Sequence, residues 1–398
     1  MGAIYKNSSL TISALAAENS QGGCFQTRDP LPIQPCKLVG RLYPDSDPED
    51  IWVYDNRVRF LDSEPSGKTA KLNTRGWVMQ ERVFSNRVLH FGAKQLFWEC
   101  NTLQACEAFP ESLSLWTEQD WEVEKFKTIL SPPIASNRAW ESPIPAAMDA
   151  RHIRYADWQV LVGYYVTLEL TYGSDKLMAI SALAQEWERL LGGGEEYLAG
   201  LWKSDLCRQL LWRMDFTEVR ERKRFQPYRA PTWSWASVEG AISTVTNPIV
   251  TYTLDPKVCT PKADVISTFV RPVDGGHPTG QVIDANIALK GRIKAARLKK
   301  ADSGVYRLDD LELKGANVLP TLLHPDFDLE DGQEIRCLLL LTVNAFPAGS
   351  GTAPAAFGLL LEPAGSLKDT YGRLGTFKLA GGHCSWFDNC DMQKVILI

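Results

Sequence analysis

Several residue patterns that mark common enzymes are absent from this chain. Its 398 residues contain only five histidines, and no HExxH, phosphate-loop, GxGxxG or GxSxG motif occurs. These absences argue against the usual zinc proteases, P-loop proteins, dinucleotide-binding enzymes and serine hydrolases. The sequence therefore predicts no metal site and no bound cofactor.

The cysteine pattern also lacks the features of metal-binding or disulfide-rich proteins. Nine cysteines are an odd number, and none belongs to a CxxC pair. Cys100 and Cys106, like Cys384 and Cys390, are six positions apart, which fits neither common zinc spacing. We therefore expect reduced and mostly buried thiols.

Targeting segments and excess charge are missing as well. No basic stretch followed by an apolar core opens the chain, and no apolar run approaches about 18 residues, so we expect a cytoplasmic protein without a membrane span. The net charge is −5, and Arg220–Arg224 is the only dense basic cluster. We interpret that cluster as a solvated helix end or loop and expect no nucleic-acid partner. The oligomeric state is not indicated.

The chain does contain two conspicuous tryptophan-bearing segments. Leu72–Cys100 reads LNTRGWVMQERVFSNRVLHFGAKQLFWEC, and Tyr228–Gly240 reads YRAPTWSWASVEG. Together they resemble the heterokaryon-incompatibility (HET) family of fungal proteins, whose pattern runs N-T-R-[GA]-W-x-x-Q-E-R, L-H-F, Q-x-x-W-E-C and R-A-P-[ST]-W-S-W-A-S. This resemblance identifies a family better than it identifies a function.

The start of the chain departs from the ordinary family pattern. Met1–Phe25 resembles a segment that lies inside other HET proteins. The L-S-Y-x-W-G and W-I-D-x-x-C-I-x-Q patterns that precede it there, with most of a TIR-like α/β unit, do not occur here. Either the gene model is clipped or the front half has been lost; we favour loss. The resemblance then implies that the effector action attributed to the TIR-like half is missing.

Hydrophobic periodicity predicts the local structure. A helix over Arg75–Phe84 with Thr74 as its N-cap precedes a hairpin of Arg87–Phe91 and Gln95–Cys100. Four further helices are expected at Trp116–Leu130, Ala156–Leu170, Asp175–Leu191 and Tyr197–Met214.

From about Ile249 short β-type runs alternate with glycine, proline and aspartate, and Ile335–Val343 (IRCLLLLTV) is typical of a central strand. We therefore predict an α+β fold: a mainly helical N-terminal lobe with a short β-hairpin, followed by a mainly antiparallel β C-terminal lobe. The expected domains are residues 1–245 and 246–398.

Most of the polar residues in these motifs have a structural interpretation. His90 is expected to lie near Glu99 or Arg82 as a scaffold histidine, and Glu81 and Arg82 to pair with Arg75 or Glu99. If these residues instead surround a pocket, its walls would be tryptophans, which suit an apolar ligand. The candidate walls are Trp77, Trp98, Trp233 and Trp235, and the candidate hydrogen-bond donors are Gln80, Arg82, His90 and Ser234.

Two functions are compatible with these features. HET-like proteins without the front half include norbornene-forming Diels–Alderases, and the resemblance implies a cofactor-independent cyclase acting on an apolar terpenoid-type small molecule. Such a reaction needs positioning, worth several kcal/mol, and one donor aimed at a carbonyl, worth roughly 2–4 kcal/mol. The alternative is a truncated heterokaryon-incompatibility protein that acts as a non-catalytic recognition or interaction module.

Overall fold

A computed structural model gives the fold of the chain in two compact units. It describes residues 2–41, 43, 47–53, 70–111, 127, 129–130, 150–215, 223–243, 259–273, 275–301, 304–309, 311, 322–348, 351–365 and 367–398. The N-terminal unit is Met1–Pro132 with Leu168–Leu170, and the C-terminal unit is Pro133–Thr167 with Thr171–Ile398. The domain boundary expected after residue 245 lies outside the described residues and stays a prediction.

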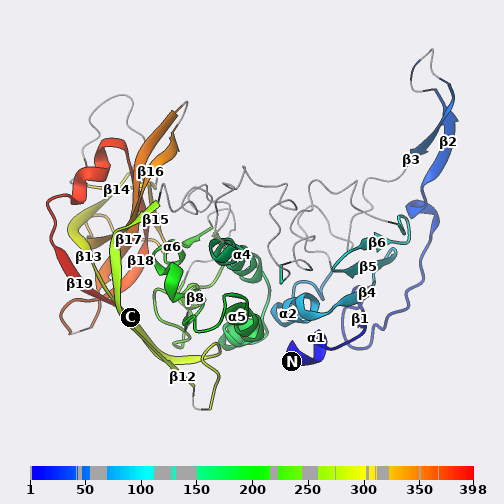
Figure 1. The fold of residues 1–398 in the computed structure, drawn as a ribbon, viewed down its shortest axis with the longest axis horizontal. Coiled ribbons are helices and arrows are strands. Elements are labelled where there is room, and N and C mark those ends of the chain that lie inside the picture. The colour runs from blue at the N-terminus through cyan, green and yellow to red at the C-terminus, as the bar shows by residue number, and fades with distance from the viewer. Residues whose placement is uncertain are drawn as a thin grey trace. The chain divides into compact units, whose positions relative to one another are not determined.

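The N-terminal unit is built mainly from strands. A four-stranded sheet has the order β1-β4-β5-β6, with β1 parallel to β4 and the other pairs antiparallel. In Figure 1 the ribbon of β2 and β3 stands apart from this sheet. The elements are α1 (Gly2–Lys6), β1 (Thr11–Ser13), η1 (Leu31–Ile33), β2 (Cys36–Gly40), β3 (Glu49–Val53), α2 (Gly76–Phe84), β4 (Arg87–Phe91), β5 (Leu96–Cys100) and β6 (Gln104–Cys106).

The prediction of a mainly helical N-terminal lobe was wrong. Strands hold more of the described chain than helices do. The helix and hairpin expected over residues 75–100 are confirmed, although α2 begins at Gly76 and Thr74 bonds back to Lys71 instead of capping it. The helix expected at Trp116–Leu130 lies almost wholly outside the described residues.

The largest error concerns Tyr197–Met214, which was predicted to be one helix. Gly200 has φ +112°, a conformation that a helix cannot contain, and the chain turns there between two short strands. The segment instead divides into β7 (Tyr197–Leu198), β8 (Leu201–Trp202), η5 (Lys203–Asp205), α6 (Leu206–Gln209) and β9 (Arg213–Met214). The apolar residues of this segment are divided among several short elements that are buried on more than one face. Their spacing therefore did not mark one apolar face of a helix.

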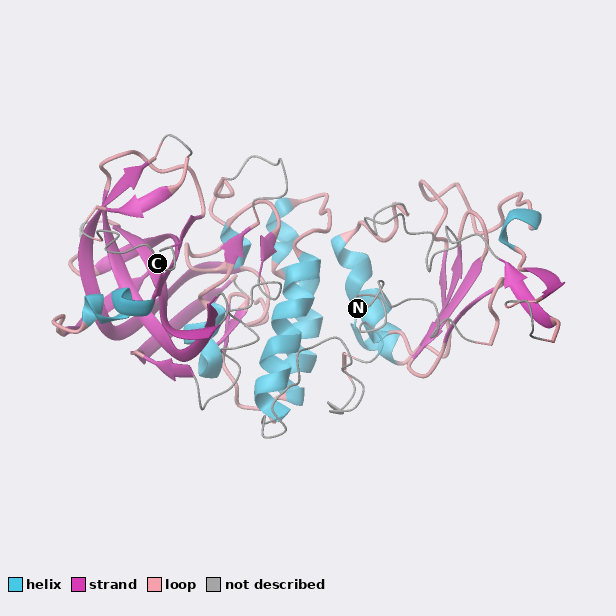
Figure 2. Ribbon diagram, turned by 90° about the horizontal axis from the view of Figure 1, so that it is seen from above, coloured by secondary structure: helices cyan, strands magenta, loops and turns pink. Residues whose placement is uncertain are grey.

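Two longer helices of the C-terminal unit are confirmed with shifted ends. They are α4 (Ala150–Tyr165) and α5 (Met178–Leu190), the latter preceded by η4 (Gly173–Lys176). Figure 2 shows them lying together, and Trp158 of α4 meets Trp187 of α5 with ring centroids 5.6 Å apart. No helix among the described residues is both long and apolar enough to cross a lipid bilayer.

Most of the rest of the C-terminal unit is one large mixed sheet, and β9 pairs separately with β10 (Ile242–Ser243). Pairings between β13, β16, β17, β18 and β19 return to β13 and close five strands into a ring, whose one parallel pair is β18 with β19. The prediction was a mainly antiparallel β lobe, and this parallel pair makes the sheet mixed instead. The elements are η6 (Trp235–Ser237), β10 (Ile242–Ser243), β11 (Cys259–Pro261), β12 (Ala263–Pro272), β13 (Val282–Lys300), β14 (Tyr306–Leu308), β15 (Leu322–Pro325), β16 (Glu334–Ala348), β17 (Gly351–Pro363), β18 (Thr370–Ala380), η7 (Gly381–Phe387) and β19 (Met392–Leu397).

The apolar run in β16 shows why the sequence lacked alternation there. Ile335, Cys337 and Leu339 join the main core of the ring. Leu341 and Val343, beyond a register shift, pack into a second cluster. Because both faces of β16 are covered, nearly every side chain is apolar.

A buried arginine ties the ring to the segment before β9. Arg373 of β18 is fully buried and donates to Asp326 from Nε at 2.8 Å and from Nη2 at 3.2 Å. The same guanidinium donates to the carbonyls of Leu210 and Trp212 and lies 3.4 Å from the Trp212 ring centroid. All three nitrogens of the Arg373 guanidinium therefore donate to protein groups.

The cysteines agree with the expected chemistry in part. All nine are free in the structure, and their reduced state stays a prediction, whereas the expectation of mostly buried thiols was wrong. Cys106, Cys259 and Cys337 are buried, whereas Cys36 on β2 is exposed and the others are half-buried. No three histidine, cysteine, aspartate or glutamate side chains in the described part of the chain lie close enough to hold a metal ion.

Candidate functional site

The β4–β5 hairpin and helix α2 bring together the most highly charged buried group in the N-terminal unit. Burial alternates along both strands, so His90 of β4 and Glu99 of β5 point to the buried side. Arg82, in the last turn of α2, reaches the same place. The predicted neighbourhood of these three residues is confirmed.

Glu99 is the centre of this group. Its carboxylate has no exposed surface and accepts two hydrogen bonds of 2.7 Å from Nε and Nη2 of Arg82. Burial alone would raise the pKa of Glu99, but the charge and the two hydrogen bonds of Arg82 outweigh it and hold that pKa well below its usual value. The carboxylate is therefore ionised at neutral pH.

Lys127 adds a second cation to this group, which no sequence pattern predicted. Its Nζ lies 3.7 Å from Glu99 Oε1 and donates to the backbone carbonyls of Arg82 and Ser85, each at 2.5 Å. These carbonyls belong to the C-terminal end of α2, where a cation is favourable. Burial, aided by the charge of Arg82 and opposed by Glu99, lowers the pKa of Lys127 to about 8.

His90 completes the cluster as a neutral ring. Its Nε2 lies 3.3 Å from Glu99 Oε1, yet neither ring nitrogen makes a well-directed hydrogen bond to any described residue. Burial lowers the pKa of His90; Glu99 opposes this effect, and Arg82 and Lys127 reinforce it. A neutral imidazole beside one carboxylate and two cations leaves the cluster with one net positive charge.

The other candidates from the N-terminal unit do not share one surface. Gln80 is 2% exposed, and its Oε1 has no hydrogen-bond partner among the described residues. Trp77 is half-buried on α2. Trp98 is half-buried on the face of β5 opposite to Glu99, because neighbouring strand residues point to opposite sides.

The remaining three candidates belong to the C-terminal unit, where they act as scaffold. Ser234 donates to the Ala199 carbonyl at 2.5 Å and accepts from the Ala236 amide at 3.0 Å, capping η6. Trp235 Nε1 and Trp158 Nε1 both donate to the carbonyl of Gly200.

Trp233, the last candidate, is fully buried as well. Its carbonyl accepts from Trp212 Nε1 at 2.9 Å, and its own Nε1 has no hydrogen-bond partner in the described part of the chain. The eight predicted site residues thus fall into two units. The four predicted donors, Gln80, Arg82, His90 and Ser234, are all at least nine-tenths buried.

A hollow on the surface of the N-terminal unit is lined by charged and polar side chains, whereas the cluster around Glu99 is buried. It has a volume of about 480 Å³ and is lined by Gln26, Arg28, Pro30, Ile33, Gln34, Pro35, Lys94, Glu107 and Ala108. Arg28 donates to Glu107 at 2.7 and 3.3 Å, and Glu107 also accepts from the Leu96 amide at 3.0 Å. Arg28 is thereby held against the edge of β5.

Sequence reasoning missed this hollow. Residues 21–48 read simply as a glycine- and proline-rich loop, and such a loop gives no sign of which of its polar residues are held in place. The one usable signal was Arg28-Asp29-Pro30, a charged pair directly before a rigid turn.

A sequence model of the family "Heterokaryon incompatibility protein (HET)" matches residues 1–81. The N-terminal part of the chain is therefore similar to HET proteins. The HET segment includes α1, β1, the β2–β3 ribbon, much of the hollow and the first part of α2, but it stops before Arg82 and the β4–β5 hairpin. No curated protein and no solved structure matches the chain.

Proposed function

We propose that this chain is a non-catalytic recognition module of heterokaryon incompatibility and that the hollow of its N-terminal unit binds an acidic segment of a protein partner. The HET match at residues 1–81 supports the biological role. One observation supports the location: six of the nine residues that line the hollow belong to the HET segment, and the lining includes the Arg28–Glu107 pair and Lys94.

The charge and shape of the hollow favour this class of partner. Arg28 and Lys94 are two cations and Glu107 is one anion, so the hollow carries one net positive charge. Ile33, Pro30 and Pro35 supply an apolar floor, and the two glutamine side chains can bond to a backbone. These are the features with which a loop surface binds an extended acidic peptide.

The cyclase alternative has less support. A cyclase of the kind considered above needs a donor that can reach a substrate carbonyl. In the described residues, Arg82 is engaged with Glu99, Ser234 with Ala199, and Gln80 and His90 are buried inside the N-terminal unit. The Diels–Alderase interpretation therefore gains nothing from this geometry.

A gene replacement distinguishes these functions. Deleting the gene in its own strain is expected to abolish the death of fusion cells with at least one strain that the parent rejects, and the unaltered gene is expected to restore it. Arg28→Glu should fail to restore rejection, because it reverses the charge of the hollow. Arg271→Glu is a matched control, since Arg271 is an exposed arginine of β12 with a 3.8 Å ion pair to Asp284.

Two outcomes would overturn the proposal. The deletion strain could reject every partner that its parent rejects, which would remove the recognition role. Alternatively, its metabolite extract could lose a cyclised compound and gain an isomer of equal mass, which would establish the cyclase instead.

A further inference from the structure

Strand β12 (Ala263–Pro272) forms an outer edge of the large sheet in the C-terminal unit. It pairs with β13 on one side and stands last in the order of the sheet, at its outer side in Figure 1. In the part of the chain that the structure describes, the backbone groups of residues 264–271 form hydrogen bonds only within the β12–β13 pair. The outer edge of β12 therefore carries unpaired N–H and C=O groups, which can bind another strand.

One irregularity of β12 decides how another strand can align with it. The register with β13 shifts between Val265 and Ser267, so Ile266 is an extra residue without a partner on β13. Because of this bulge, exposed side chains occur on both sides of it on the same face of the strand. They are Asp264, Ser267, Phe269 and Arg271. The half-buried side chains of the opposite face are Val265, Thr268 and Val270.

The sequence of β12 is complementary to itself once Ile266 is set aside. In an antiparallel pair, residues directly opposite one another lie on the same face. If Thr268 is opposite Thr268 of a second copy, every opposed pair meets this condition. The pairs, each formed twice, are Ser267 with Phe269, Val265 with Val270, and Asp264 with Arg271. A two-fold axis at Thr268 thus brings each charge of the strand opposite one of the other sign.

The neighbouring charges on β13 extend this complementarity. Asp264 is opposite Lys290, and Arg271 is opposite Asp284 with an ion pair of 3.8 Å. Across the four strands of a paired assembly, the row would read Lys290 and Asp264 of one copy, then Arg271 and Asp284 of the other. The sign of the charge alternates along the whole row, which favours this pairing over one that places like charges opposite each other.

Apolar side chains at the same edge are left in water by a single copy. Ile266 is 52% exposed, Phe269 is 46% exposed and Ile283 of β13 is 42% exposed. A second copy paired along β12 would cover part of this surface, and removing apolar surface from water favours association.

We propose that two copies of this chain associate through their β12 strands, antiparallel and about a two-fold axis at Thr268. Such a contact uses the same surface on both copies, so it closes at a dimer. One strand pair is small beside the about 1,200–2,000 Å² of a standard interface, and we expect a dissociation constant in the micromolar range. The dimer is independent of the recognition role proposed above, because β12 lies wholly in the C-terminal unit. Arg271→Glu is therefore expected to restore rejection although it weakens the dimer.

The first test is sedimentation equilibrium of the full-length chain at increasing concentration. The mean mass is expected to rise from one copy towards two and to stop there. A chain that stays monomeric up to about 1 mM, or a mass that continues to rise beyond two copies, overturns the proposal.

The second test exchanges charges in the proposed register. In Asp264→Lys dimers the new lysine faces Arg271, and in Arg271→Glu dimers the new glutamate faces Asp264, so each variant alone should associate roughly tenfold more weakly than the parent or worse. An equal mixture of the two variants should recover the parental affinity, because both contacts of the mixed dimer then join opposite charges.

A matched control accompanies this exchange. Arg297→Glu changes another exposed arginine of β13's sheet, which lies on β13 and pairs with Glu334 at 2.9 Å, and it should associate as the parent does. A mixture that associates no better than its separate components, or an equal loss in Arg297→Glu, overturns the proposed register.

Hydrogen exchange locates the contact without any substitution. Peptides from β12 should gain protection as the concentration of the chain rises through the dissociation constant, since the outward amides become bonded. Peptides from β2, an exposed strand of the N-terminal unit, should show no such gain. Protection that rises at β2 and stays constant at β12 would place the dimer elsewhere and overturn the proposal.

Discussion

The two units each bury a carboxylate with an arginine, but they balance its charge differently. Glu99 in the N-terminal unit faces Arg82, Lys127 and a neutral His90. Asp326 in the C-terminal unit pairs with Arg373, and the charge of Arg224 also acts on it; Arg373 in turn donates to two carbonyls and lies against an indole ring. In the first cluster one carboxylate compensates two buried cations, whereas in the second Arg373 divides its hydrogen bonds between a carboxylate and two carbonyls.

This difference teaches how each unit depends on its acid. The Glu99 carboxylate offsets the cost of burying two cations, Arg82 and Lys127. At Asp326 the carboxylate is one of several partners of a single cation. The same substitution, acid to amide, should therefore have unequal effects in the two places.

The largest expected effect follows from Glu99→Gln. This change removes the charge that compensates Arg82 and Lys127 and should lower the free energy of opening of the β4–β5 hairpin by about 5 kcal/mol. Hydrogen exchange followed by mass spectrometry on hairpin peptides measures that quantity locally. A loss below about 1 kcal/mol would mean that the two cations find other compensation.

Asp326→Asn should cost less, about 3 kcal/mol, because Arg373 keeps its carbonyl partners and its stacking on Trp212. Exchange in peptides of β15 and β18 gives the value in the same kind of experiment. If this loss equals or exceeds that of Glu99→Gln, the contrast between the two acids fails.

The smallest effect is a pH dependence confined to the N-terminal cluster. The pKa of Lys127 falls from 10.5 to about 8 on folding, so between those pH values the unfolded chain binds more protons and stability must rise with pH. The expected gain is about 1–3 kcal/mol. Urea denaturation across this range gives the slope, which Lys127→Met should flatten. An unchanged slope in that variant would assign the rise to another group.

Part of the fold was predictable because local patterns decide it. Alternation in residues 87–100 gave the hairpin, and an amphipathic pattern gave α5. The pattern failed at Tyr197–Met214, where a glycine with positive φ and burial on all sides replace periodicity. It also could not show that β13 pairs with β12, β14, β16 and β19, since the farthest of these partners lies about a hundred residues away along the chain.

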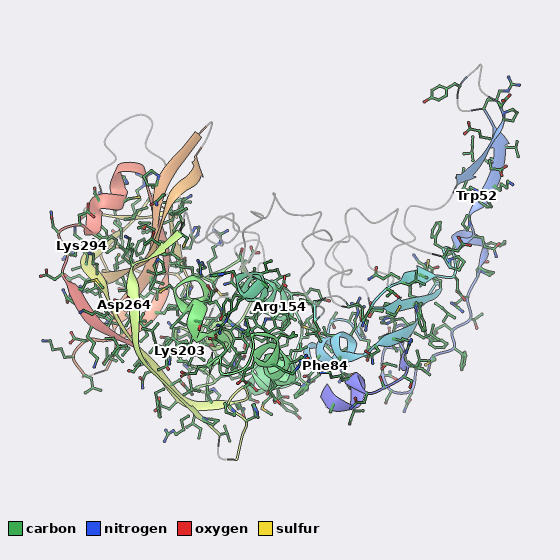
Figure 3. All side chains as sticks on the ribbon, in the orientation of Figure 1. Trp52, Phe84, Arg154, Lys203, Asp264 and Lys294 are labelled. Atoms are coloured by element: carbon green, nitrogen blue, oxygen red, sulfur yellow. The ribbon has the colours of Figure 1, made fainter. Side chains whose placement is uncertain are left out.

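The candidate sites divide in the same way. The contact of Arg82 with Glu99 was predictable because the helix that carries Arg82 and the hairpin that carries Glu99 were both predicted. Lys127 was not, since one lysine in a charge-rich segment looks solvated until the fold places it under α2. The hollow at Arg28 depends on how its loops fold, which no local pattern specifies. Trp52 of β3, labelled in Figure 3, likewise proved 57% exposed although its residue type suggests a core position.

The closed ring of the C-terminal unit has a consequence for biosynthesis. The strand Met392–Leu397 closes the ring by pairing with residues 287–292 of β13 and with Thr370 and Tyr371 of β18. Until those six residues have been made, these strand segments lack that partner, and unpaired strand edges pair readily with other chains. The earliest-made part of the ring, β13, therefore waits for a partner that is made about a hundred residues later.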